Sequence, residues 1–381
     1  MYLALYRKYR PKTFDEVVGQ EHITKTLINQ IKMDKISHAY LFTGSRGTGK
    51  TSSAKIFARA INCSNPVNGS PCGECEVCRG LADNNIDVLE IDAASNNGVD
   101  EIRDLREMVK YPPVVGKYKV YIIDEVHMLS SSAFNALLKT LEEPPKHTVF
   151  ILATTEVHKL PATILSRCLR FDFKLVSLDN LIGLLRKVLD EEKISFDEQS
   201  INIIARAGEG SVRDTLSIAD RCVSFSGSEL TSQKVISVLG VSEKEILIQI
   251  TNSILKKQIG SSLVKLDEIL SSGISPLVFS SDLISYFRDL LLINALGDDS
   301  RNIIVVKDDI YEQMKVQSEP VNYATIIKAI EILSGIEQEL RYSSNSRLVL
   351  ETTLVKIISE SSLLERVEKL EEIVKNKFPS N

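Results

Sequence analysis

The chain has 381 residues, of which 43% are hydrophobic and 25% are charged, and its mean hydropathy is close to zero. A chain of this length is expected to fold as two or three domains. It contains no apolar run near the roughly 18 residues that a membrane span requires, which excludes a membrane-spanning protein. The first residues place their charges after a short apolar patch, the wrong order for a secretory signal. We therefore expect a cytoplasmic protein without a membrane partner.

Charge is distributed unevenly along the chain. The formal net charge is −5, yet residues 1–60 carry 11 Lys and Arg against four Asp and Glu. A basic first segment in an acidic chain favours an anionic ligand near the N-terminus. A solvated charged surface is the alternative interpretation of the same numbers.

The first 176 residues alternate short runs of Val, Ile, Leu and Phe with helical patterns. This alternation predicts an α/β domain at 1–176 with a parallel sheet covered by helices. The predicted strands, each expected to be buried on both faces, are Ala39–Thr43, Val88–Ile91, Val120–Ile123, Val149–Ala153 and Leu169–Phe173. The predicted crossover helices are Lys50–Ile61, Val99–Lys110 and Ser132–Leu141.

The run Gly44-Ser45-Arg46-Gly47-Thr48-Gly49-Lys50-Thr51 follows the first strand and opens a helix. It fits G-x-x-x-x-G-K-[ST], in which backbone N–H groups and the helix N-terminus hold phosphate oxygens. We expect Lys50 to neutralise the β- and γ-phosphates and the Thr51 hydroxyl to bind Mg²⁺. A merely glycine-rich turn is the alternative. The expected phosphate-binding residues are Gly44, Gly47, Thr48, Gly49, Lys50, Thr51 and Ser52.

Four cysteines lie in one module, residues 62–79. Cys63, Cys72, Cys75 and Cys78 have the spacing C-x₈-C-x₂-C-x₂-C, which lets four thiolates reach one tetrahedral Zn²⁺. Disulfides or an iron–sulfur cluster are the alternatives. The two other cysteines, Cys168 and Cys222, are expected to be buried structural thiols.

The third strand runs into Asp124 and Glu125, which places both carboxylates at the carboxyl edge of a parallel sheet, where ligands bind. We expect Asp124 to hold Mg²⁺ and Glu125 to orient and activate the attacking water. An acidic surface turn is the alternative. His127 follows the pair, but a packed or surface histidine is equally consistent with its position, so it is left out of the catalytic set.

Helical periodicity dominates from about Val176 onward. We predict a small helical domain at 177–243 and a larger one at 244–362, separated by the Gly240-Val241-Ser242 break. Within the first, a helix is predicted at Asp197–Ala207. The next helix opens with Ser211-Val212-Arg213-Asp214, which resembles a capping box. Apolar spacing in 363–381 predicts an amphipathic tail rather than a coiled coil.

Further motifs carry a family resemblance. A phosphate loop followed by Asp-Glu resembles AAA+ ATPases, and Ser166-Arg167-Cys168 is similar to the arginine-finger motif of their clamp-loader members. The set of similar families becomes smaller when three further features are considered: the stretches Tyr6–Phe14 and Val17–Gln20 and the four-cysteine module. Together these motifs resemble the gamma/tau family of bacterial DNA polymerase III. The resemblance covers residues 1 to about 225.

The resemblance assigns further roles. Thr155 would be the sensor-1 residue near the γ-phosphate, with Thr154 as the fallback, and Arg213 would be the sensor-2 arginine. Arg167 would be a catalytic finger acting in trans on a neighbouring subunit's nucleotide. The helical domains would be a lid at 177–243 and an oligomerisation collar at 244–362. The residues implied to line the adenine and ribose are Tyr6, Arg10, Pro11, Val17 and Val18.

The implied function is that of an ATP-hydrolysing motor that opens a sliding clamp and loads it onto primer–template DNA. Implied cofactors are ATP, Mg²⁺ and Zn²⁺. Implied partners are delta-type and delta-prime-type subunits, further gamma/tau copies, the clamp and DNA, with polymerase and helicase reached through a longer form. The place of work would be the cytoplasm, at the nucleoid. Such a subunit shares the holoenzyme's DNA-directed DNA polymerase name but has no polymerase site. A nucleotide-binding scaffold without hydrolysis and a DNA-repair AAA+ motor are the alternatives.

Overall fold

The computed structural model describes residues 2–360 except 81–86, 97, 240–243, 272, 305 and 307. The chain divides into two compact units, Met1–Val235 and Ile236–Asn381, which are described separately. The Gly240–Ser242 break and the predicted tail at 363–381 lie outside the described residues. The predicted domain bounds at 176/177 and 243/244 remain predictions. None of the described helices is long and apolar enough to cross a membrane.

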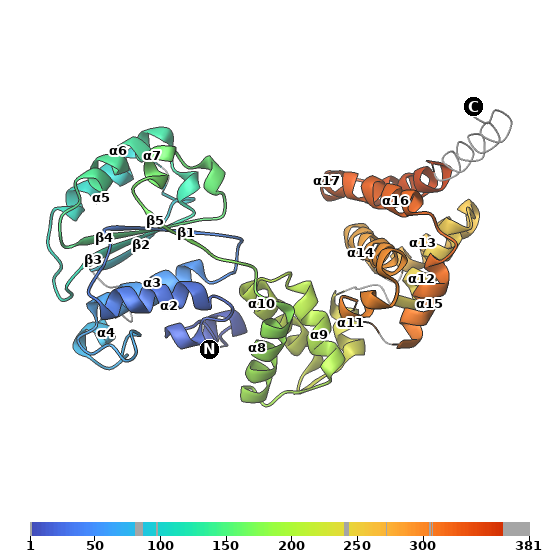
Figure 1. Cartoon of the computed structure of the whole chain (residues 1–381), viewed down its shortest axis with the longest axis horizontal. Helices are drawn as coiled ribbons and strands as arrows, with labels where there is room; N and C mark the ends of the chain where they lie inside the picture. Colours follow the sequence, from blue (N-terminus) through green and yellow to red (C-terminus); the bar gives the residue numbers. More distant parts are fainter. Residues whose placement is uncertain are drawn as a thin grey trace, which may run out of the picture. The chain divides into compact units, whose positions relative to one another are not determined.

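A five-stranded parallel sheet forms the core of the first unit (Figure 1). Its strand order is β2-β3-β4-β1-β5. Both the parallel direction and the predicted strands are confirmed, each within one residue at either end. Strand β1 pairs with β4 on one side and with β5 on the other. The turn after β1 therefore lies between the carboxyl ends of β4 and β5. The strands are β1 (Ala39–Thr43), β2 (Val88–Asp92), β3 (Lys119–Asp124), β4 (Thr148–Thr154) and β5 (Leu169–Asp172).

Helices cover both faces of this sheet (Figure 1). On one face lie α2 (Glu21–Lys32) and α3 (Lys50–Asn62), and on the other α5 (Val99–Val109) and α6 (Ser131–Glu142). Side chains alternate along β1, so Tyr40 and Phe42 join Phe57 of α3 in one core, whereas Leu41 joins Leu137 of α6 in the other. In the three inner strands every residue except Asp124 is buried, and their place between two helical layers explains the continuous apolar runs.

The two edge strands depart from the prediction of burial on both faces. The side chains of β2 are half-buried or exposed, and in β5 only Phe171 is buried, with Leu169 41% exposed. That prediction is wrong for these strands because each has a neighbour on one side only. Apolar composition alone does not distinguish a central strand from an edge strand.

The helical part of the first unit follows β5. Its helices begin with side-chain caps: Asp197 accepts from the Ser200 N–H, and Ser211 Oγ accepts from the Asp214 N–H at 3.2 Å. The predicted capping box is only half formed, because the Asp214 carboxylate accepts the Ser211 hydroxyl rather than the Ser211 N–H, which bonds to Gly208 O. The helices are α8 (Leu178–Glu191), α9 (Glu198–Ala207), α10 (Val212–Ser226) and α11 (Ser232–Leu239), the last reaching into the second unit.

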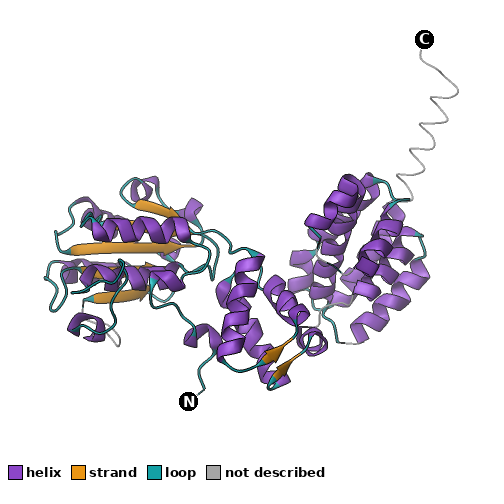
Figure 2. Cartoon of the chain, turned by 60° about the horizontal axis from the view of Figure 1, so that its bottom comes forward, coloured by secondary structure: helices purple, strands orange, loops and turns teal. Residues whose placement is uncertain are grey.

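The second unit is helical throughout its described residues (Figure 2). Its core is centred on α14, whose Phe279, Leu283 and Phe287 are fully buried. A polar contact inside it joins three helices, because Tyr286 of α14 donates to Gln317 of α15, which donates to Ile248 O of α12. The helices are α12 (Lys244–Leu255), α13 (Ile259–Ser271), α14 (Pro276–Leu296), α15 (Asp308–Ser318), α16 (Tyr323–Gly335), α17 (Glu337–Tyr342) and 346–360.

Candidate nucleotide site and metal centre

The loop between β1 and α3 has the backbone geometry that phosphate binding needs. Gly44, Gly47 and Gly49 all have φ between +75° and +137°, a range that disfavours other residues. A side chain at Gly44 would also lie 2.3 Å from Phe173 O, and one at Gly47 would lie 1.9 Å from Ser211 Oγ. The loop leads into α3, so backbone N–H groups and the positive end of the helix dipole point to one place.

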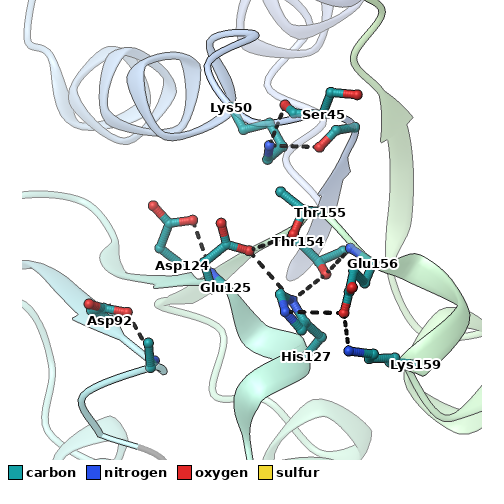
Figure 3. Close-up of polar contacts among 12 residues, drawn as sticks. Ser45, Lys50, Asp92, Asp124, Glu125, His127, Thr154, Thr155, Glu156 and Lys159 are labelled. Atoms are coloured by element: carbon teal, nitrogen blue, oxygen red, sulfur yellow. Dashed lines mark hydrogen bonds and ion pairs between the residues drawn. The ribbon is translucent and has the colours of Figure 1, made fainter. Parts of the chain in front are cut away.

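Lys50 is the first residue of α3, and its side chain folds back over the loop. Its Nζ donates to Gly44 O at 2.7 Å and to Ser45 O at 2.8 Å (Figure 3). Burial lowers the pKa of Lys50, and the nearby charges of Glu125 and Asp124 oppose this shift. The ammonium group thus lies beside the loop whose backbone N–H groups are expected to bind phosphate.

Thr51 and Asp124 come together from α3 and the end of β3. Thr51 Oγ1 donates to Asp124 Oδ2 at 2.7 Å, and Asp124 Oδ1 accepts the Glu125 N–H at 3.0 Å. One hydroxyl and one carboxylate beside a phosphate loop are the hard oxygen donors that Mg²⁺ prefers. These residues therefore fit the predicted metal pair.

Glu125 stands in a left-handed conformation, with φ of 47°, directly after β3. Its carboxylate accepts the Thr155 hydroxyl at 3.0 Å (Figure 3). Thr154, the fallback for the sensor role, is fully buried and its hydroxyl instead contacts His127 Nδ1. The geometry thus brings Thr155, rather than Thr154, to the acidic residue expected to activate water.

His127 belongs to this site although the sequence analysis left it out. Its side chain is only 8% exposed, and its ring nitrogens lie 3.4 Å from Glu125 Oε2 and 3.5 Å from Glu156 Oε2. Glu156 pairs in turn with Lys159. The available signal was its position two residues after the acidic pair, in the short helical turn Val126–Met128.

The N-terminal segment approaches the loop from another side. The Arg213 guanidinium lies 5.4 Å from the Tyr6 ring centroid, a cation–π contact between the N-terminus and α10. Arg10 Nε donates to Ser52 Oγ at 3.2 Å. The first contact joins two residues that the resemblance assigned to nucleotide binding, and the second joins a third such residue, Arg10, to Ser52 of the expected phosphate-binding set.

The rest of that segment is anchored by Gln20, which the sequence analysis mentioned only as part of a motif. Gln20 is fully buried, and its amide donates to Lys174 O at 2.7 Å and to Thr48 O at 3.4 Å. It therefore joins the segment both to the phosphate loop and to the chain after β5. Val17 is buried close to Gly49, while Pro11 and Val18 are half-buried.

A cavity of about 510 Å³ lies where the phosphate loop meets the helical part of the first unit. Ser45 and Arg46 border it on one side, and Gly208 and Ser211 on the other. None of the adenine-side residues lines it. The Arg213 N–H donates to Gly47 O at 3.4 Å, so this part of the chain contacts the loop directly.

Arg167 is held within its own chain. Its guanidinium donates to Glu142 Oε1 at 2.7 Å, at the end of α6, and to Thr163 O at 2.8 Å. Neighbouring Cys168 is half-buried rather than buried, whereas Cys222 is fully buried as expected. Burial raises the pKa of each of these two thiols to about 11, in keeping with unreactive cysteines.

The four cysteines of the predicted metal module converge. Their sulfur atoms all lie within 4.8 Å of one another, with 3.9 Å between Cys63 and Cys75 and between Cys72 and Cys78. Four sulfurs at about 2.3 Å from one tetrahedral zinc ion would be about 3.8 Å apart, whereas a disulfide needs about 2.05 Å. The arrangement therefore fits one tetrahedrally bound ion and not disulfides.

Backbone N–H groups supply the outer shell of this module. The Cys72, Cys75 and Cys78 N–H groups donate to the sulfurs of Cys63, Cys72 and Cys75 at 3.3–3.4 Å. For Cys75, burial alone would raise the pKa, but the N–H groups of Cys78 and Ser64, together with hydrogen bonds from the thiols of Cys78 and Cys72, lower the pKa to about 6. Such bonds orient thiolates and stabilise their charge for a metal.

Comparisons with known proteins agree along most of the chain. Family models match residues 19–177 (DNA polymerase III, delta subunit), 181–228 (DNA polymerase III clamp loader subunit, ATPase lid domain) and 230–373 (DNA polymerase III subunits gamma and tau domain III).

Individual relatives carry the same names. DNA polymerase III subunit tau of Bacillus subtilis is 46% identical over 98% of this chain and 68% of the relative. Subunit tau of Escherichia coli is 36% identical over 94% of this chain and 55% of the relative. Subunit gamma of Buchnera aphidicola is 36% identical over 94% of this chain and 99% of the relative. The chain thus spans about half to two thirds of the two tau subunits. It belongs to the gamma/tau family of DNA polymerase III, and its residues 181–228 match the ATPase lid domain of a DNA polymerase III clamp loader subunit.

Proposed function

We propose that this subunit is an ATP-hydrolysing motor, which opens a sliding clamp and loads it onto primer–template DNA. The observation that carries the proposal is the meeting of four side chains beside the phosphate loop. Thr51 contacts Asp124 at 2.7 Å, and Thr155 contacts Glu125 at 3.0 Å. A scaffold that only binds nucleotide has no need for an acidic residue poised beside the metal pair.

ATP binding rests on the loop and on Lys50. Loop N–H groups receive the phosphate oxygens, and Lys50 exchanges the Gly44 and Ser45 carbonyls for phosphate oxygens of higher charge. Thr51 and Asp124 would hold Mg²⁺, which would neutralise charge that develops on the phosphates. The buried position of Lys50 strengthens its attraction for phosphate, since little water screens the charge.

Hydrolysis needs a residue that orients water and a charge that stabilises the transition state. Glu125 orients and deprotonates the water, and Thr155 holds Glu125 and senses the γ-phosphate. Arg167 supplies positive charge to the nucleotide of a neighbouring subunit, a role typically worth about 10³–10⁵ in rate. For this it leaves Glu142, its ion-pair partner in its own chain.

The helical part of the first unit transmits the state of the site. Ser211 and Arg213 pack against Gly47, so phosphates that bind to the loop influence the position of the start of α10. Tyr6 contacts Arg213 from the N-terminal side. We propose that ATP draws these elements together and so sets the arrangement of subunits in the ring.

The module of Cys63, Cys72, Cys75 and Cys78 holds one structural Zn²⁺, supported by the sulfur separations. Proposed partners are delta-type and delta-prime-type subunits, further gamma/tau copies, the sliding clamp and primed DNA. A longer form, of which this chain would span about two thirds, would also reach the polymerase and helicase. This work would take place in the cytoplasm, at the nucleoid.

Clamp loading itself tests the proposal. A labelled clamp is incubated with primed circular DNA and the reconstituted loader, then separated from free clamp by gel filtration. Wild-type loader with ATP should leave clamp on the DNA, and the Lys50→Ala loader should not. Equal clamp transfer by both loaders would refute the motor role and favour a scaffold.

A further inference from the structure

His127 sits between two carboxylates at the centre of the site (Figure 3). It lies in the turn after β3, and its side chain is only 8% exposed. Its Nδ1 is 3.4 Å from Glu125 Oε2 and 3.0 Å from Thr154 Oγ1, while Nε2 faces Glu156 Oε2 at 3.5 Å. A buried imidazole with polar partners on both nitrogens has a defined orientation, which a merely space-filling residue does not need.

The His127 imidazole is also anchored by residues other than Glu125. Glu156 donates its N–H to Thr154 Oγ1 at 3.0 Å, so the two groups that contact the ring also fix one another. Lys159 forms an ion pair with Glu156 and holds the pKa of that carboxyl below its usual value, which keeps it ionised near neutral pH.

Glu125, in contrast, has little else to fix it. Its backbone adopts the left-handed conformation, and its side chain is 32% exposed. The polar groups found beside its carboxylate are the Thr155 hydroxyl and His127. Thr155 approaches from the position after β4 and His127 from the turn after β3, so together they restrict the directions that the carboxylate takes. A misplacement of about 1 Å in such a group lowers rates by about a hundredfold.

We propose that His127 is a positioning residue for Glu125: the imidazole, anchored by Thr154 and Glu156, keeps the Glu125 carboxylate directed toward the attacking water. This inference rests on the proposed hydrolytic function. His127 acts through Glu125 and does not itself touch the nucleotide. Its removal should therefore slow hydrolysis while leaving ATP affinity unchanged.

Two substitutions separate the two ring nitrogens. In His127→Asn the amide group sits two bonds from Cβ, as Nδ1 does, and faces Glu125 and Thr154. In His127→Gln the amide group sits three bonds from Cβ, as Nε2 does, and faces Glu156. A positioning role through Nδ1 predicts that Asn retains most of the hydrolysis rate, whereas Gln and His127→Ala lose about tenfold to a hundredfold.

The measurement is steady-state ATP hydrolysis by the reconstituted loader with clamp and primed DNA, beside ATP affinity of each variant by calorimetry. His38→Asn is the matched control, because His38 is exposed and precedes β1, at the far end of that strand from the phosphate loop. Unchanged affinity with the rate order wild type, Asn, then Gln and Ala supports the proposal. Equal rates in Asn and Gln would overturn it, as would parallel loss of affinity and rate.

The failure of this proposal is distinguishable from failure of the proposed function. If Glu125→Gln abolishes hydrolysis while all His127 variants keep the wild-type rate, only the positioning role is overturned. If the wild-type loader shows no hydrolysis that depends on Glu125, both are overturned. If His127→Ala does not fold, the Asn and Gln pair still decides, since each retains a polar atom in the buried space.

Discussion

The four-cysteine module contacts the N-terminal segment through a buried hydrogen bond. The Phe14 N–H donates to Ser70 Oγ at 3.1 Å, and both residues are almost fully buried. Gly69 beside it packs so closely on Ile28 of α2 that a Cβ would lie 2.8 Å from Ile28 Cγ2. Phe14 lies three residues before Val17. The loop of the four-cysteine module therefore contacts the segment that is expected to border the adenine.

Ser70→Ala leaves the Phe14 N–H buried without its acceptor, which costs about 1–3 kcal/mol of unfolding free energy. For a unit of this size each kcal/mol lowers Tm by about 2–4 °C, so we expect a fall of about 2–12 °C. Differential scanning calorimetry of the full chain measures it, and titration with ATP should show weaker binding. Ser64→Ala, at an exposed position of the same loop, is the control. A shift in Tm no larger than that of the control would refute the reasoning.

Four further outcomes are expected. Lys50→Ala should weaken ATP binding about 30-fold or more, because a buried charge pair is lost; unchanged affinity by calorimetry would remove the phosphate-loop assignment. Arg167→Ala should leave ATP affinity intact and lower hydrolysis of the assembled loader by about 10³-fold or more, and loss of both together would argue against action in trans. Metal analysis should find about one zinc ion per chain, with Tm falling on chelation; metal-free protein with oxidised cysteines would contradict the module. Backbone N–H groups and Lys119 hold the pKa of Asp87 below its usual value despite burial. The stabilisation that the Asp87 carboxylate contributes is therefore present above about pH 4 and lost as the pH falls through the folded pKa. Asp87→Asn should flatten the acid limb of a stability–pH curve, and an unchanged limb would disprove this.

The α/β core was predictable because its signals are local. A strand buried on both faces needs a continuous apolar run, and the phosphate loop needs glycine at positions with positive φ. Thr51 and Asp124 were predicted as partners, and they lie within hydrogen-bond distance. Their proximity was predictable because strand ends of a parallel sheet gather at one edge, whatever the strand order.

What the sequence left open depends on strand order and on distant pairs. The exposure of β2 and β5 follows from their edge positions, which their residues do not encode. His127 acquires Thr154 and Glu156 as neighbours only because β3 pairs with β4, nearly 30 residues apart along the chain. Arg167 likewise meets Glu142 across a strand and several turns. No spacing rule links such residues, so only coordinates reveal them.

Steady-state ATP hydrolysis by the reconstituted clamp loader tests the central claim most directly. The rate is measured with and without the sliding clamp plus primed DNA, for wild type and for Glu125→Gln. We predict strong stimulation by clamp and DNA in the wild type and its loss in the variant, with ATP still bound. A low rate that neither clamp nor DNA changes, in a verified assembly that binds ATP, would contradict the motor role.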